Sequence, residues 1–229
     1  MPSWPLSDED RLSLERFGEL LEQYGTERFL VSPLVRADVH DFPDRWAPTI
    51  DHTRALIARL FELAGTPCAL EVEPGEGFSA GRETWLELVE AGPGRARFVI
   101  GSLGLDDVPG AASHEVGRAI LAMSSTHPYR EIREELPTAT DGSYGAILVG
   151  LGVLAANVAC YVERRTVIRR GGLSNDAFGL LLAAQDRVRK TPQHAALATL
   201  RDSARDAYRE WRDLLEPHRD ELCALMHVE

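Results

Sequence analysis

The feature that most constrains the fold is a charge-free run of 18 residues, GAILVGLGVLAANVACYV, which extends from Gly145 to Val162. A helix that spans a membrane needs about 20 predominantly apolar residues. This run is shorter, is rich in glycine and alanine, and contains the polar Asn157. We therefore predict no membrane span but a buried central helix, starting near Asp141 and continuing into residues 163–165, around which the rest of the chain packs.

Composition narrows the class of protein further. Of the 229 residues, 44% are hydrophobic and 27% are charged, as is usual for a water-soluble domain. Acidic residues outnumber basic ones by 36 to 25, and the net charge of -11 disfavours nucleic-acid binding, which needs a basic face. The three cysteines form no CxxC pair, which argues against a disulfide framework and favours a cytoplasmic protein. Residues 1–17 lack the basic and apolar regions of a signal peptide.

Helical patterns flank a short β region near the N-terminus. A first helix is predicted from the capping residue Ser7 to Gly25, and a second from Thr49 to Ala64, with a loop and a short extended piece over 28–48. Three strands are expected to follow as an antiparallel meander, joined by the turn residues 74–77 and 91–94. The predicted strands are Cys68–Glu73, Glu83–Glu90 and Arg95–Ile100.

The remainder of the chain is predicted to be helical. One helix starts at Asp107 or Ser113, another runs from Ser174 to Arg189, and a long last helix runs from Thr191 to Pro217 with its Leu/Trp stripe inward. The fold class expected is α+β: N-terminal helices, a small antiparallel three-stranded sheet, and a mainly helical C-terminal half with a central apolar helix. We expect a single domain over 1–229, with an N-terminal helix and loop (1–48), a core (49–190) and the long C-terminal helix (191–229).

One segment carries chemistry: His114-Glu115-Val116-Gly117-Arg118, at the start of an amphipathic helix. In the H-E-x-x-H motif, two histidines at i and i+4 bind zinc from one helix face, and the glutamate is the general base for a zinc-bound water. His114 and Glu115 occupy their expected positions, but Arg118 stands where the second histidine belongs. A guanidinium has no lone pair to donate, so Arg118 is not a zinc ligand.

Around this motif the chain resembles a group of bacterial zincin-like, metallopeptidase-like proteins over about residues 50–190. In that group, a small sheet precedes the HExxH helix, an apolar helix reading roughly GLGVFxAN follows it, and a later GxLS segment opens another helix. The matching segments in this chain are GLGVLAAN at 150–157 and Gly172-Leu173-Ser174. The resemblance implies a zincin-like core, and a third zinc ligand from an acidic residue near the start of the apolar helix.

The candidates for that acidic residue are Glu134, Glu135 and Asp141, although Asp141 is also placed to cap the apolar helix. With Arg118 in the motif, we expect a vestigial site made of these acids with His114, Glu115 and Arg118. In that site Arg118 pairs with Glu115 or with one of the three acids, and its fixed cation replaces the metal. Two alternatives stay open: His114 is a core histidine bonded to a backbone carbonyl, or His127 supplies a relocated ligand.

Three functions follow from these alternatives. The first is a catalytically degenerate, zincin-like pseudoenzyme that binds a protein partner or acts as a scaffold and needs no metal. The second is a metal-dependent hydrolase with a rearranged zinc site, in which Glu115 is the catalytic base and His114 is joined by Asp141, Glu135 or His127. The third is an enzyme or partner subunit that uses the same cleft without metal, with the last helix available for a homo-oligomer. Phosphate-binding and serine-hydrolase motifs are absent from the sequence.

Overall fold

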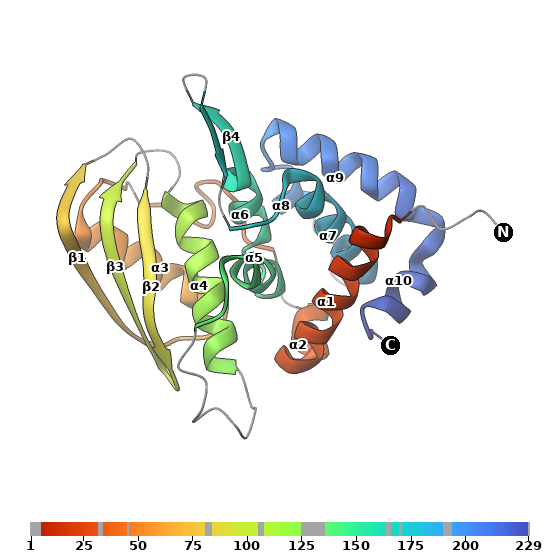
Figure 1. The fold of residues 1–229 in the computed structure, drawn as a ribbon, viewed down its shortest axis with the longest axis horizontal. Helices are drawn as coiled ribbons and strands as arrows, with labels where there is room; N and C mark the ends of the chain where they lie inside the picture. Colours follow the sequence, from red (N-terminus) through yellow and green to blue (C-terminus); the bar gives the residue numbers. More distant parts are fainter. Residues whose placement is uncertain are drawn as a thin grey trace.

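The molecule combines a small β-sheet at one end with a body of helices, so the predicted α+β class is confirmed (Figure 1). The computed structural model describes residues 6–31, 34–44, 46–80, 84–104, 108–124, 136–163, 166–169, 171–189 and 194–228. Within these ranges, every helix is too short or too polar to cross a membrane.

The N-terminal helices begin where local capping predicts. In α1 (Asp8–Tyr24), Ser7 forms a capping box with Asp10, and Gly25 ends the helix with a φ of 113°. In α3 (Ile50–Leu63), the hydroxyl of Thr49 accepts the backbone N–H of His52 in the first turn. Both predicted helices are confirmed. The loop predicted over 28–48 is wrong in part, since α2 (Thr26–Val31) extends into it.

The sheet contains β1 (Ala69–Ala80), β2 (Trp85–Gly92) and β3 (Arg95–Leu103), in the order β1-β3-β2. β2 and β3 form the predicted antiparallel hairpin. β1, however, pairs in parallel with β3 rather than antiparallel with β2. The sheet is therefore mixed, and the predicted antiparallel meander is wrong.

The error traces to the Pro-Gly-rich segment 74–77, whose composition predicts a turn. In the structure this segment lies inside β1, as an irregularity in register between Pro74 and Ser79, and the strand continues in the same direction to Ala80. There β1 has reached the end of β3, opposite Leu103, and β2 starts on the other side of β3 with Trp85 opposite Ser102. β2, the next strand in the sequence, therefore pairs with the other side of β3 and is not a neighbour of β1.

Only one face of the sheet belongs to the core. Val72, Leu88, Phe98 and Ile100 are buried on this face, and the ring of Phe98 meets Phe61 of α3 edge-on with 6.2 Å between centroids. α3 and α4 lie on this side, whereas no described helix lies on the opposite face of the sheet (Figure 1). Burial of large apolar side chains on one face is what holds the sheet to the helical body.

The predicted central helix is present as two helices, α5 (Ala139–Leu148) and α6 (Gly152–Ala159). They are separated at Gly150, whose φ of 88° is unfavourable for other residues and ends the helical path. Every residue from Gly142 to Ala159 is buried, as the absence of charge there predicts, whereas Ala139 at the start of α5 is exposed. α5 packs against α4 (Val108–Ser124). Beyond α6 the predicted helical continuation is wrong: a hairpin of β4 (Cys160–Glu163) and β5 (Thr166–Arg169) projects from the body (Figure 1).

The predicted last helix is also divided in the structure. α8 (His194–Leu197) and α9 (Asp202–Leu215) are separated at residues 198–201, where the side chain of Asn157 replaces the missing helical hydrogen bonds. Its amide nitrogen donates to the Thr199 carbonyl (3.1 Å), and its oxygen accepts the Arg201 N–H (2.7 Å). A polar residue inside the apolar run therefore stabilises a break in another segment.

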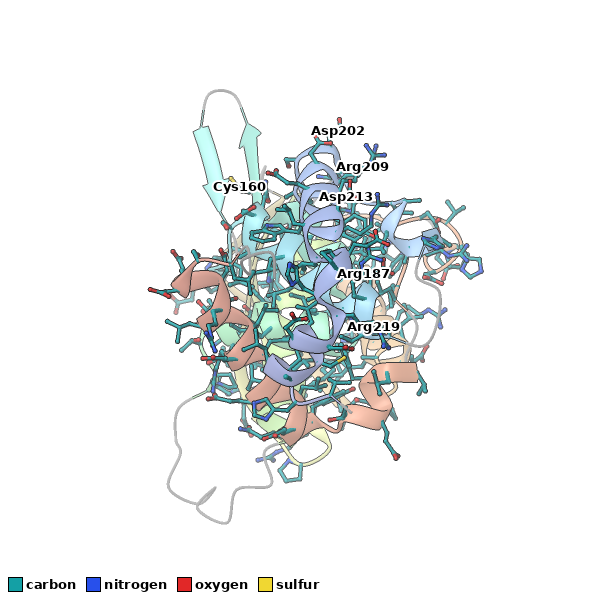
Figure 2. The ribbon with its side chains drawn as sticks, turned by 90° about the vertical axis from the view of Figure 1, so that its right-hand side faces the viewer. Cys160, Arg187, Asp202, Arg209, Asp213 and Arg219 are labelled. Carbon is teal, nitrogen blue, oxygen red and sulfur yellow. The ribbon has the colours of Figure 1, made fainter. Side chains whose placement is uncertain are left out.

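The apolar stripe of α9 packs against another helix of the same chain. Ala204, Tyr208, Trp211 and Leu215 are buried against α7 (Asn175–Val188), as the inward stripe predicts. Figure 2 shows the outer side of α9, with Asp202, Arg209 and Asp213 along it. After α9, Pro217 lies in a 3-10 turn and the chain restarts as α10 (Arg219–Leu225). The stripe that could have joined two copies is thus occupied by α7 of the same chain.

Candidate functional site

The motif helix α4 lies between the sheet and α5, so neighbouring motif residues meet different partners (Figure 1). Glu115 points toward the edge strand β2, whereas His114 meets α5 and the segment before α7. Arg118 lies one turn after His114 and donates to Glu115 of the same helix and to the Pro137 carbonyl, just before α5. The helix thus places the three side chains near one another but gives each its own surroundings.

His114 is held in a closed pocket of backbone and ring atoms. Only 4% of its surface is exposed, and its Nδ1 lies 3.1 Å from the hydroxyl of Ser143, which is fully buried. The Ser143 hydroxyl donates to the Gly171 carbonyl, and the His114 Nδ1 lies at hydrogen-bond distance from the same hydroxyl. The ring of Phe178 meets the imidazole edge-on at 5.9 Å. Of the interpretations left open, the core histidine is the nearest, with a serine hydroxyl where a backbone carbonyl was expected.

Glu115 is engaged by two donors. Its Oε2 accepts the backbone N–H of Leu88 in β2 at 2.8 Å and the Arg118 guanidinium, also at 2.8 Å. Burial raises the pKa of this carboxyl above its usual range, against the opposing effects of the two donors, and nearby Glu87 raises it further. A raised pKa suits a general base, but this oxygen also serves to bind β2 to α4.

Arg118 forms the ion pair with Glu115 that was one of the predicted pairings, and that prediction is confirmed. The side chains of the two residues are only 15% and 14% exposed. The Nε of Arg118 also donates to the Pro137 carbonyl at 2.8 Å. The stem of the arginine packs on Gly142 of α5, where any Cβ would overlap it. The arginine is thus built into the contact between α4 and α5.

Asp141 belongs to a different local structure. It is the third residue of α5 and forms a capping box with Thr138, which is the actual N-cap. It also pairs with Arg16 of α1 at 3.1 Å. Burial alone would raise its pKa, but the bonds to Thr138 and Arg16 outweigh burial and lower it. The predicted pairing of Arg118 with Asp141 is not formed. The other predicted site residues, His127, Glu134 and Glu135, lie outside the described residues.

The donors that the structure describes around His114 do not by themselves form a zinc site. A catalytic zinc needs three protein ligands and an open position for water. Where side chains are described, no three His, Cys, Asp or Glu residues come close enough together to hold a metal. Furthermore, the helix face that carries His114 and Arg118 is covered by the backbone of Gly142 and by Gly171, at both of which a Cβ would overlap these side chains. We therefore derive no chemical step through a metal.

Neither Ser143 nor Gly171 could be selected from the sequence. The Gly171-Gly172 pair predicts the end of a helix, and both residues have positive φ values, 73° and 80°, that favour glycine. Nothing in the sequence indicates that these two glycines lie against His114.

Comparisons of the chain with protein-family models, with characterised proteins and with solved structures give no match.

The buried carboxyl predicts a pH effect of known sign. Because the folded pKa of Glu115 is raised, its contribution to stability is complete below the ordinary value of 4.5 and is lost as the pH rises through the folded pKa. The stability of the wild type relative to Glu115→Gln should therefore fall from about pH 4.5 upward, measured by urea unfolding at a series of pH values. Asp141→Asn is the control of opposite sign. Because the pKa of Asp141 is lowered, the stability that its carboxylate contributes should be lost as the pH falls through the folded pKa. The expectation would be contradicted if the stability of the wild type relative to Glu115→Gln stayed constant, or increased, as the pH rises.

Proposed function

We propose that this protein is a catalytically degenerate, zincin-like module that binds a protein partner or acts as a scaffold in the cytoplasm. The observation that carries the proposal is the state of Glu115, the one candidate general base. Its Oε2 accepts bonds from Arg118 and from the Leu88 N–H, so the group that would activate water instead joins α4 to β2.

The closed surroundings of His114 support the same conclusion. A hydrolytic site must admit a substrate and water, whereas the imidazole is enclosed by Ser143, Gly171 and Phe178. Cys68, Cys160 and Cys223 are all free thiols, which agrees with a reducing compartment. The buried pair of Arg118 with Glu115 supports the proposal because it engages the carboxylate that a hydrolase would need free.

The metal content of the purified, untagged protein tests this function. After dialysis against trace zinc, elemental analysis should give close to zero zinc per chain, and added zinc should leave the thermal midpoint unchanged. His114→Ala, measured in parallel, should have the same zinc content as the wild type. About one zinc per chain in the wild type that is lost in His114→Ala would overturn the proposal. That result would instead support a metal-dependent hydrolase with a rearranged site.

A further inference from the structure

The outer face of the three-stranded sheet is a second surface with chemistry of its own. It is turned away from α3 and α4, and no described helix packs on it (Figure 1). Strand alternation places on this face the residues that are not buried in the core. We call it the outer sheet face and define it by Glu71, Glu73, Trp85, Glu87 and Val99, together with Arg95 and Arg97 of β3.

Trp85 is the main apolar group of this face. It is 49% exposed, although tryptophan is among the most costly side chains to leave in water. Its ring lies over Gly101 of β3, where a Cβ would overlap the ring. Beside it, Val99 lies against Gly75, 3.0 Å from the position of a Cβ there. Contact with Gly101 and Gly75 thus fixes the positions of Trp85 and Val99 but leaves the Trp85 ring half-exposed.

Carboxylates flank this surface on both sides. In the strand register, Val99 lies between Glu73 of β1 and Glu87 of β2, so both acids stand in the row next to Trp85. Strands are about 4.8 Å apart, which places a group above Val99 within reach of both. Glu90 is neutralised by Arg95 and Arg97, but Glu71, Glu73 and Glu87 form no ion pair with any residue that the structure describes.

The unpaired carboxylates of the outer sheet face indicate what kind of partner it binds. Since Arg95 and Arg97 on this face are already paired with Glu90, a second copy of the chain would bring the unpaired Glu73 and Glu87 against like charges, and each chain carries a net charge of -11. A cation is favoured instead, and arginine is favoured over lysine because a planar guanidinium both stacks on tryptophan and pairs with carboxylates. Trp85 and Glu87 are two residues apart along β2, and the Trp85 ring lies over Gly101, two residues from Val99 along β3. This spacing of about 7 Å is also that of alternate residues in an extended chain.

We propose that the outer sheet face binds an extended, arginine-containing segment of a partner protein, of the form Arg-x-Arg. One guanidinium lies over Val99 between Glu73 and Glu87, and the next stacks on the ring of Trp85. The proposal rests on the binding role proposed above and specifies its partner. It does not depend on the zinc content, so the two tests fail independently.

Binding of a labelled peptide to the full-length chain tests this surface. The probe is fluorescein-labelled Gly-Thr-Arg-Thr-Arg-Thr-Gly, followed by fluorescence anisotropy at about 0.15 M salt, where long-range attraction is screened. Trp85→Ala should weaken binding about fivefold to tenfold, and the Glu73→Gln/Glu87→Gln double variant about tenfold. A peptide with lysine in place of arginine should bind several-fold more weakly than the arginine peptide.

Matched variants on α9 control for charge and for lost apolar surface. Asp206→Asn/Glu210→Gln removes the same charge from exposed positions, and Leu214→Ala removes a side chain that is 43% exposed. Both should bind within about twofold of the wild type. Equal weakening in the two charge variants, or a Kd above about 1 mM for the wild type, would overturn the proposal. So would a dimer in solution that Trp85→Ala dissociates. The glutamate variants keep the test decisive if Trp85→Ala does not fold.

Discussion

Replacement of Arg118 by methionine should lower the free energy of unfolding by about 3 kcal/mol at pH 8. Methionine keeps the apolar stem on Gly142 but removes the cation that pairs with Glu115. The remaining carboxylate is buried, with the Leu88 N–H as its other donor. Since loss of the cation raises the pKa of Glu115 further, the destabilisation should be smaller near pH 4.5 and grow as the pH rises. Urea unfolding at both pH values measures the effect.

Two variants separate the ion pair from general damage at this position. Glu115→Gln combined with Arg118→Met removes the unpaired charge and keeps an acceptor for Leu88, so the double variant should recover most of the loss. Arg11→Met breaks the exposed pair with Glu15, whose side chains are 59% and 39% exposed, and should change stability by less than about 0.5 kcal/mol. A change as small as this in Arg118→Met would show that the pair does not stabilise the site.

The substitution Gly117→Ala should destabilise the protein by at least about 3 kcal/mol. Gly117 of α4 faces Gly145 of α5, and a Cβ at position 117 would overlap the backbone of Gly142 and Ala146. These are backbone atoms of a buried helix, so the clash can be relieved only if α5 moves away from α4. Thermal and urea unfolding give the loss, and separation of the helices should also disturb the contact of Arg118 with Gly142.

The outward part of the same helix offers the control for this substitution. Ala122 of α4 is partly exposed, and Ala122→Ser should change stability by less than about 0.5 kcal/mol. If Gly117→Ala were equally mild, the close approach of α4 and α5 would not be needed for folding. In that case α5 could lie farther from α4, and the His114 face would not have to be covered.

The starts of three helices were predicted well from the local sequence. Ser7, Thr49 and Ser174 each cap a helix in the structure, at the positions expected from the sequence. Capping depends on hydrogen bonds between residues two or three positions apart, so the information lies within a few residues. The pairing of Arg118 with Glu115 was predictable for the same reason, since residues at i and i+3 adjoin on a helix.

Features that depend on distant segments were predicted wrongly or not at all. The parallel pairing of β1 with β3 joins segments whose sequence patterns suit either direction, and segment 74–77 continues as a strand where a turn was expected. The break between α8 and α9 depends on Asn157, more than forty residues earlier in the chain. In each case a hydrogen bond to a distant backbone group decided the local conformation.

The sequence by itself determined the α+β class, the buried apolar segment around Gly145, and the presence of a non-ligating arginine, Arg118, four residues after His114, because composition, periodicity and side-chain chemistry are properties of the residues themselves. Only the tertiary structure decided that His114 is enclosed by Ser143 and Gly171 and that Glu115 binds the edge of β2. Whether a side chain is free to react depends on which atoms the rest of the chain places against it, and packing of distant segments sets those neighbours.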